Sequence, residues 1–591
     1  MLNPSNRTLY STMLKPPAGY SLDRALGTSY SLDPLMALTI PLQLALFDTD
    51  KSINDMVVLY EAIRRVSEKL DIFIDKGRIS VPNGTQSLYI MLEPVLHEVS
   101  AIGGGAFHPK CWLLRYKDNK SGEFFHRFIV LSRNLTFDRS WDISCCLDED
   151  LSKEKTGSDQ NQPIIDLFSS LITHISDSNR RTEADKMLDG LDQIEWEYPD
   201  DVKKIDFFVS GINGVPNKRI QMPEAISKMI VSPFCSDNAI QNVIKKPGWK
   251  ANVLVSRTET LDGLSSDTLN LFKEVYVLAD EYLLEEDDEG LDALEGLHAK
   301  VFAYNHNRNT SVIYLGSANA TNAALEYYNN VEFMVRLEGN FYKLGTEICN
   351  EYMGFKDFLV EYKPGDRKPA ESDENEKILD ELFNTIRNGK YLLYCKEVTE
   401  DTSELILKAD SFNLHDDRAR LYAWPITRGE NSSKEIAANE ISLGTMSNIN
   451  LTGLIAFRIQ VDSSHEKVFA INIPLENPPE NREQLLIRSI IGNKNNFIRY
   501  IYMLLSCNDE VSSYEAMHHL FGNGGSSLKG YDYIKLPLLE EMIKTLTTNR
   551  ESFWAIKSII DKLPDEDDEI VPADFRILWS EIEKAMEVID A

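Results

Sequence analysis

Two well-separated stretches of the chain carry the same four reactive residue types in the same order. The types are histidine, lysine, serine and asparagine, which stand at His108, Lys110, Ser132 and Asn134 in the first copy and at His298, Lys300, Ser317 and Asn319 in the second. Lysine can neutralise the oxygens of an anionic phosphodiester, and serine and asparagine can hold them. One imidazole can attack phosphorus while a protonated imidazole donates to the leaving oxygen. The duplicated pattern predicts phosphodiester chemistry without a metal ion.

Hydrophobic runs around each copy indicate how its residues are positioned. The runs read as strands at 111–114 and 128–131 in the first copy and at 301–304 and 312–315 in the second. Because alternate side chains of a strand share a face, each histidine and lysine should project together beside the Ser-x-Asn turn. Each copy supplies only one histidine. A two-histidine site must therefore be assembled from both halves of one chain, or from one half and its mate in a dimer.

The paired motifs resemble the phospholipase D superfamily, and the resemblance covers roughly the first 365 positions. It implies two catalytic lobes in which His108 forms a phosphohistidine and His298 protonates the leaving group and then activates water, although the order could be reversed. Family members also place an acidic or amide residue after the Ser-x-Asn to orient an imidazole. Glu332 fits this role in the second copy, and Asp142 is the nearest candidate in the first. Ser132, Arg133, Ser317 and Asp142 are the candidate substrate-binding residues.

Both copies depart from the usual pattern of that superfamily. The aspartate expected five positions after the lysine is replaced by Arg115 and Asn305, and Leu131 stands where the first copy should have the glycine of Gly-Ser-x-Asn. The missing aspartates resemble tyrosyl-DNA phosphodiesterase and bacterial nuclease branches more than lipid-cleaving phospholipases. The resemblance therefore implies a nucleic-acid substrate.

The charge balance is strongly acidic, with 62 Lys and Arg against 93 Asp and Glu and a formal net charge of −31. Nucleic-acid affinity rests largely on basic side chains, but exposed charges more than about 8 Å apart are screened at physiological salt. Lys110, Arg115, Arg133 and Lys300 can therefore line a locally positive channel. Weak non-specific binding favours delivery of nucleic acid, DNA rather than RNA, by a partner such as a helicase or another ATPase.

A dense acidic stretch at 280–289 stands just before the second His-x-Lys. It has two interpretations, an autoinhibitory segment that imitates a phosphate backbone and, as the favoured one, an ordinary solvated loop.

Other features restrict the class of protein. No P-loop and no zinc-ligand spacing occur, so no cofactor and no metal site are predicted. The longest apolar stretch is shorter than a membrane span and no signal peptide is recognisable, which predicts a cytoplasmic protein with no membrane association. Seven cysteines without a Cys-x-x-Cys spacing predict reduced thiols.

The alternation of strands and helices predicts an α/β fold with two pseudo-symmetric phospholipase D-like lobes, whose mixed sheets are flanked by helices. A small β module and a helical C-terminal region should follow. The predicted boundaries are a first lobe at 1–165, a helical connector at 166–215, a second lobe at 216–365, a β-rich accessory domain at 366–480 and a helical C-terminal domain at 481–591.

Three functions remain open from the sequence. The leading one is a metal-independent nuclease or DNA-end phosphodiesterase, acting as the effector of a bacterial anti-phage defence or restriction system. The alternatives are a phospholipid phosphodiesterase and a catalytically inactive scaffold that binds nucleic acid or protein. Association of two chains into a homodimer is also open.

Overall fold

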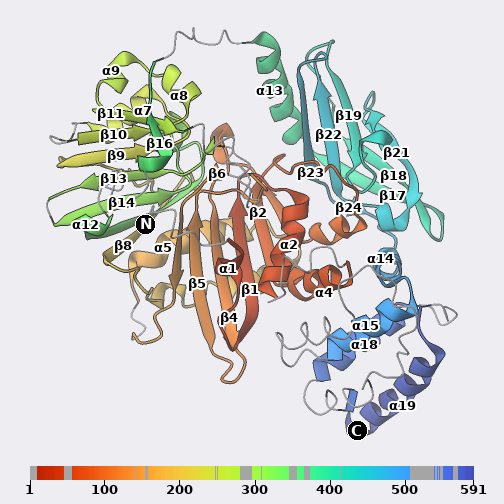
Figure 1. Ribbon diagram of the computed structural model, residues 1–591. Coiled ribbons are helices and arrows are strands. Elements are labelled where there is room, and N and C mark those ends of the chain that lie inside the picture. Colours follow the sequence, from red (N-terminus) through yellow and green to blue (C-terminus); the bar gives the residue numbers. More distant parts are fainter. Residues whose placement is uncertain are drawn as a thin grey trace.

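The structure is a computed structural model in which two large sheets, a β module and a helical region follow one another along the chain (Figure 1). The described residues are 10–45, 56–138, 140–153, 157–245, 248, 251–279, 296–307, 309–344, 356–364, 373–412, 414–505, 538, 542–543, 545, 550–563 and 570–590. This arrangement confirms the predicted α/β class with its β module and helical C-terminal region. The acidic stretch at 280–289 lies outside the described residues.

The first large sheet has six strands in the order β3-β2-β1-β4-β5-β7. Its strands are β1 (Tyr20–Ser29), β2 (Leu70–Asp75), β3 (Leu96–Val99), β4 (Cys111–Asp118), β5 (Phe124–Leu131) and β7 (Ser144–Asp148). β1, β2 and β3 run parallel, whereas β4, β5 and β7 continue the sheet in antiparallel pairs. The sheet is therefore mixed, as predicted.

The second large sheet has eight strands in the order β16-β11-β10-β9-β13-β14-β15-β8. Its strands are β8 (Val202–Ser210), β9 (Ser227–Val231), β10 (Ala251–Val255), β11 (Glu274–Leu278), β13 (Val301–Asn305), β14 (Thr310–Gly316), β15 (Glu332–Asn340) and β16 (Leu359–Glu361). The run β11-β10-β9-β13-β14-β15 repeats the order and strand directions of the first sheet. The two lobes are thus pseudo-symmetric, and β8 falls inside the range 166–215 that the sequence assigned to a connector.

Along the central strands, successive side chains are buried on opposite faces of the sheet and so contribute to two different hydrophobic cores. On β4, Trp112 and Leu114 enter the core beneath α2 (Pro34–Leu44) and α4 (Met56–Ser67). Cys111 and Leu113 enter a second core, which they share with residues of the other sheet. Because neighbouring side chains of a strand point to opposite faces, each sheet packs against its own helices and against the other lobe.

The remaining chain forms the β module and the C-terminal helices. The module pairs the sheets β21-β18-β17-β24 and β20-β19-β22-β23, between Tyr391 and Glu476, and α13 (Glu374–Arg387) shares its core. The described C-terminal helices are α14 (Arg482–Ile491), α15 (Lys494–Leu505), α18 (Arg550–Asp561) and α19 (Ala573–Asp590). Tyr500 of α15 donates to Glu61 of α4 at 2.7 Å, so these helices pack on the first lobe.

The described residues include neither a membrane-spanning helix nor a cluster of metal ligands. None of their helices is long and apolar enough to cross a membrane. They also contain no group of three or more His, Cys, Asp and Glu side chains placed to hold a metal ion.

Candidate active site

The strand order places each motif at the ends of two neighbouring strands in the middle of its sheet. His108 and Lys110 stand directly before β4, and Ser132 directly follows β5. Since β4 and β5 are antiparallel neighbours, the start of one strand meets the end of the other. β13 and β14 place His298, Lys300 and Ser317 in the same way.

Main-chain pairing then joins the two motif edges within one chain. His108 N donates to Val331 O at 2.9 Å, and His298 N donates to Trp141 O at 3.0 Å. Next to the second contact, β6 (Ser140–Trp141) pairs in parallel with β12 (Gly296–Leu297). The structure therefore assembles both motif copies in a single chain, which is the first of the two arrangements open from the sequence.

The histidines take their carboxylate partners from the opposite lobe. His108 Nδ1 lies 3.0 Å from Glu332 Oε2, and His298 Nδ1 lies 3.3 Å from Asp142 Oδ1. An ionised carboxylate only accepts hydrogen bonds, so each Nδ1 carries the hydrogen and each Nε2 keeps a free lone pair. Glu332, assigned from sequence to the second copy, thus serves the histidine of the first.

The motif serines hold these carboxylates. Ser317 Oγ donates to Glu332 Oε2 at 2.5 Å and accepts from Phe333 N at 2.9 Å. In the first lobe, Ser132 Oγ donates to Asp142 Oδ1 at 2.8 Å and accepts from the next main-chain amide, Ile143 N, at 2.9 Å. Both serines are fully buried. These hydroxyls therefore orient the carboxylates, and the substrate-binding role of the two serines stays a prediction.

The two motif lysines are fully buried and directed at main-chain oxygens. Lys110 Nζ donates to His108 O at 2.9 Å, and Lys300 Nζ donates to His298 O at 2.6 Å. Burial lowers the pKa of Lys300 to about 7. Burial and the neighbouring Lys300 lower the pKa of Lys110 well below its usual value. Such a pair of buried cationic groups favours an anionic ligand, which would stabilise their charged forms.

At neutral pH the two histidines favour their neutral forms, whereas their carboxylate partners favour their ionised forms. Burial lowers the pKa of His108 to about 4, against the raising effect of Glu332, and it also lowers the pKa of His298. Burial acts to raise the pKa of Glu332, but His108 and Lys110 hold it below its usual value. The site thus contains ionised carboxylates beside neutral imidazoles at neutral pH.

The motif asparagines carry hydrogen-bonding capacity that the described residues do not use. Asn134 Oδ1 and Asn319 Oδ1 are buried and accept no hydrogen bond within the described part of the chain. Buried polar atoms normally have a partner. Their position two residues beyond the serines is consistent with the predicted role of holding a ligand.

A second repeated feature, which the sequence analysis missed, fixes the asparagine turns. Ser29, the last residue of β1, accepts from Leu135 N at 3.0 Å through its Oγ, and Ser232, directly after β9, accepts from Ala320 N at 3.0 Å in the same way. Both serines are fully buried. Each one binds the residue that directly follows a motif asparagine, so the pseudo-symmetry extends beyond the four-residue motifs.

The predicted positive channel loses one member. Arg115 binds Asp23 at 2.6 Å, and its guanidinium lies 4.5 Å from the ring centre of Phe124. Five residues along a strand place it about 16 Å beyond Lys110, so it does not join the motif lysines. Asn305 is buried and bonded to serines, and Arg133 donates to Thr136 O at 3.1 Å within the asparagine turn.

Sequence reasoning also missed residues beside His108. The ring of Tyr30 lies edge-on to the His108 ring, with 5.1 Å between centres, and Lys110 Nζ lies 5.7 Å from the Tyr30 ring centre. Asp75 accepts from Phe107 N at 2.9 Å. Tyr30 follows β1 and Asp75 ends β2, and polar residues at the ends of parallel strands were a signal that could have identified both.

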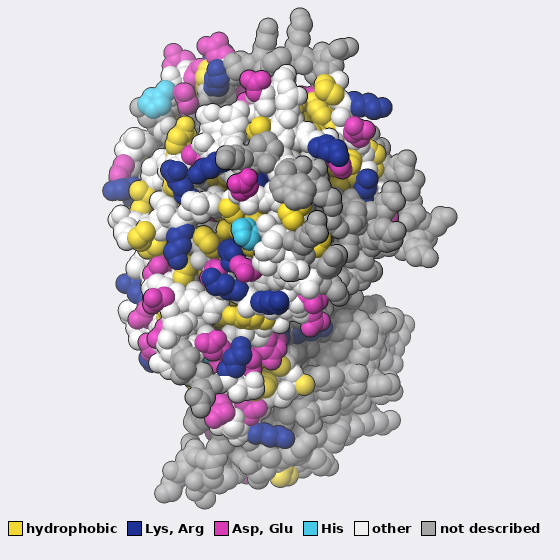
Figure 2. All heavy atoms as spheres, turned by 90° about the vertical axis from the view of Figure 1, so that its left-hand side faces the viewer, with side chains coloured by type: hydrophobic (Ala, Val, Ile, Leu, Met, Phe, Trp, Pro, Cys, Tyr) yellow, Lys and Arg dark blue, Asp and Glu magenta, His cyan; other side chains and the backbone are white. Residues whose placement is uncertain are grey.

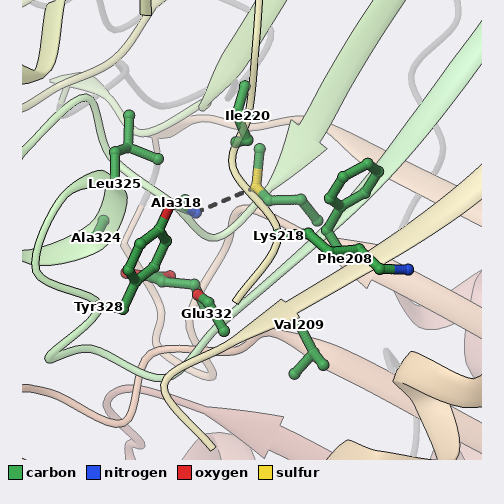
Figure 3. Close-up of a pocket in the computed structure, with 11 residues that line it drawn as sticks. Phe208, Val209, Lys218, Ile220, Ala318, Ala324, Leu325, Tyr328 and Glu332 are labelled. Atoms are coloured by element: carbon green, nitrogen blue, oxygen red, sulfur yellow. Dashed lines mark hydrogen bonds between the residues drawn. The ribbon is translucent and has the colours of Figure 1, made fainter. Parts of the chain in front are cut away.

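A small hollow lies on the second-lobe side of Glu332 (Figure 3). Most of its lining is apolar and includes Phe208, Ile220, Leu325 and Met334. Its volume of about 20 Å³ has room for roughly one water molecule. Glu332 is therefore shielded on this side, and the hollow offers no space for a substrate group.

Comparisons with known proteins give little beyond this geometry. No protein-family model matches the chain, and none of the curated proteins matches it. Among the matching solved structures is a polyphosphate kinase from Porphyromonas gingivalis, with 11% sequence identity, a TM-score of 0.31 and coverage of 62% of this chain. The alignment spans 48% of the kinase chain, about half its length. Membership of the phospholipase D superfamily stays a prediction that rests on the motifs.

Proposed function

We propose that the chain is a phosphoryl-transfer enzyme, and more specifically a metal-independent phosphodiesterase that cleaves nucleic acid through a phosphohistidine. The observation that carries this proposal is the crossed pairing of His108 with Glu332 and of His298 with Asp142. Two imidazoles with carboxylate-held Nδ1 atoms, next to two buried lysines, match what an in-line displacement at phosphorus requires.

In the first step, Nε2 of His108 attacks phosphorus, so an N–P bond forms and the bond to the leaving oxygen breaks. His298, protonated at Nε2, gives its proton to that oxygen. In the second step, neutral His298 takes a proton from water, whose oxygen attacks phosphorus and displaces His108. Glu332 stabilises the positive charge that His108 gains, while Lys110 and Lys300 neutralise the phosphoryl oxygens.

The assignment of His108 as nucleophile is supported by its surroundings. Its pKa is lowered to about 4, so its neutral, attacking form is available throughout the physiological range. Its carboxylate partner is also closer and more deeply buried than that of His298, with side-chain exposures of 2% for Glu332 and 16% for Asp142. The more solvated His298–Asp142 pair is better placed to exchange protons with water.

Aromatic side chains near both motifs support a nucleic-acid substrate. Phe137, which is 49% exposed, follows the asparagine turn of the first lobe. Phe234, which is 48% exposed, lies 5.1 Å from the guanidinium of Arg257, and Arg257 donates to Leu297 O next to His298. Aromatic rings beside cationic groups stack bases of single strands without sequence preference.

Surface charge is also compatible with weak substrate binding. Figure 2 shows Lys and Arg side chains among hydrophobic ones in the middle of one face, with Asp and Glu side chains between them. A mixed surface of this kind supports only modest electrostatic attraction to phosphates. In its more specific form, the proposal is that the enzyme acts in bacterial defence and that a partner helicase or ATPase delivers its DNA substrate.

The test is cleavage of labelled single- and double-stranded DNA and RNA in excess EDTA. Metal-independent cleavage that disappears in His108→Ala and in His298→Ala supports the proposal. His126→Ala is the matched control, because His126 forms a comparable buried pair with Glu149 at 2.7 Å outside the motifs. Cleavage of phospholipid vesicles in place of nucleic acid, or equal activity in all variants, would contradict it.

A further inference from the structure

The β module touches the backbone that carries His108. Arg387, at the end of α13, donates from Nη1 to Asp75 Oδ2 at 2.8 Å. The other oxygen of that carboxylate, Oδ1, accepts from Phe107 N at 2.9 Å. Asp75 is fully buried and Arg387 is only 9% exposed. A single carboxylate thus connects the module to the residue immediately before the histidine.

A second set of contacts also links the module to His108. The guanidinium of Arg78 lies 4.9 Å from the ring centre of Tyr30 and 4.8 Å from that of Phe383 in α13. Tyr30 in turn lies edge-on to His108. The module therefore reaches the histidine from its backbone side through Asp75 and from its ring side through Tyr30.

The loop that follows β2 is closely packed between these two sets of contacts, so its backbone has little conformational freedom. Gly77 has a φ of +75°, and a Cβ at this position would lie 2.9 Å from Cβ of Arg387. The loop is also pinned to the module where Ala470 N donates to Ile79 O at 2.8 Å. Glu98 accepts from Gly77 N at 2.8 Å and from Asn472 N at 2.9 Å. The loop that follows β2 is held between the first lobe and the module.

We propose that Arg387 is a positioning residue for His108 and that the β module is a structural part of the catalytic site. Arg387 fixes the Asp75 carboxylate, Asp75 fixes the Phe107 amide, and this fixes the direction in which the imidazole enters the site. The inference rests on the proposed function for its kinetic test. A displacement of about 1 Å in a reacting group can cost on the order of 10²-fold in rate, so such an indirect contact can control activity.

The experiment compares Arg387→Met with a matched variant of the same interface. Arg482 binds Glu93 at 2.9 Å between the segment after the module and the first lobe, but Glu93 makes no contact with Phe107 among the hydrogen bonds of the described residues. Arg387→Met should lower kcat about 10- to 100-fold with KM changed less than about twofold. Arg482→Met should leave kcat unchanged, although both variants should lower Tm.

A second variant pair protects the test against misfolding. Removal of Arg387 leaves the buried Asp75 carboxylate with Arg78, 3.8 Å away, as its remaining charged partner, and the loss of the closer one is destabilising. The double variant Asp75→Asn with Arg387→Met removes both charges but keeps an amide oxygen for Phe107 N. It should recover Tm and part of kcat relative to Arg387→Met.

A readout that needs no activity separates this inference from the proposed function. The His108 ring resonance, assigned by its loss in His108→Ala, should shift in Arg387→Met and stay unchanged in Arg482→Met. A shifted resonance in a chain that cleaves no phosphodiester would overturn the proposed function and support the positioning role. An unchanged resonance and an unchanged kcat in Arg387→Met, with lowered Tm, would overturn the positioning role and leave Arg387 a purely structural residue.

Discussion

The two lobes share a strand order and a motif, but they hold their histidines differently. His108 lies beside Tyr30 and the deeply buried Glu332, and the Asp75–Arg387 pair holds the amide of the residue before it. His298 has the longer contact with the more exposed Asp142, and Arg257 binds the carbonyl of the residue before it. Duplication thus supplies matching groups, and we propose that the different surroundings of each copy give its histidine a different role.

The largest expected effect tests this division directly. With substrate carrying labelled phosphorus, the wild-type chain should transiently acquire an acid-labile label. His108→Ala should abolish both label and cleavage. His298→Ala should slow cleavage by about 10²- to 10⁴-fold, the range for a lost general acid or base, while label stays on the protein because water is no longer activated. Label trapped in His108→Ala instead would reverse the roles of the lobes.

The carboxylates provide a second, smaller contrast. Glu332→Gln should lower kcat more than Asp142→Asn, because Glu332 is more buried and closer to its histidine. Loss of the carboxylate that fixes a catalytic tautomer can cost up to about 10⁴-fold, and we expect a value near that limit only for Glu332. Single-turnover rates measure both steps. Equal losses in the two variants would remove the asymmetry.

The pH dependence should follow from the two histidine environments. Above about pH 4 His108 is neutral, and His298 is protonated only below a pKa that burial has lowered from 6.5. The reactive state, with one neutral and one protonated imidazole, is therefore most populated in the free enzyme on the acid side of pH 6.5. The profile of kcat/KM should peak there and fall as pH rises. An optimum above pH 8 would contradict the assignment.

The smallest effect concerns the exposed aromatic side chains. Phe234→Ala should raise KM for single-stranded DNA by roughly fivefold, since stacking one base contributes about 1 kcal/mol or more. Phe234→Tyr is the conservative control. Parallel Phe137→Ala measurements show whether substrate extends along one lobe or both. A small diester without bases should respond to neither variant.

Much of this architecture could be predicted from local patterns. The apolar runs between the His-x-Lys and the Ser-x-Asn of each copy correctly located β4, β5, β13 and β14. The structure adds that these neighbouring strands pair antiparallel, which places each lysine beside its asparagine turn. The exchange of carboxylates could not be predicted, because spacing along the chain suggests a partner within the same copy. The packing of the two sheets, with the main-chain pairing of Phe107 with Val331 and of Trp141 with Leu297, brings the opposite partners together.

Contacts between residues from distant parts of the chain could not be predicted from the sequence either. Asp75 and Arg387 are separated by most of two domains, and nothing in either local sequence indicates that they meet. The carboxylate contacts of the motif serines could not be predicted for a related reason. A hydroxyl beside an asparagine suggests a ligand contact, but burial directs both hydroxyls to carboxylates.

The exchange of carboxylates also determines when the protein becomes competent during synthesis. The ribosome releases the first lobe well before position 332, and domains generally fold from the N-terminus as they emerge. Until position 298 has been made there is no second histidine opposite His108, and until position 332 has been made His108 lacks its carboxylate. A fragment released early, or cut between the lobes and separated, carries half of each pair. The enzyme we propose therefore cannot cleave nucleic acid before its second lobe has been made.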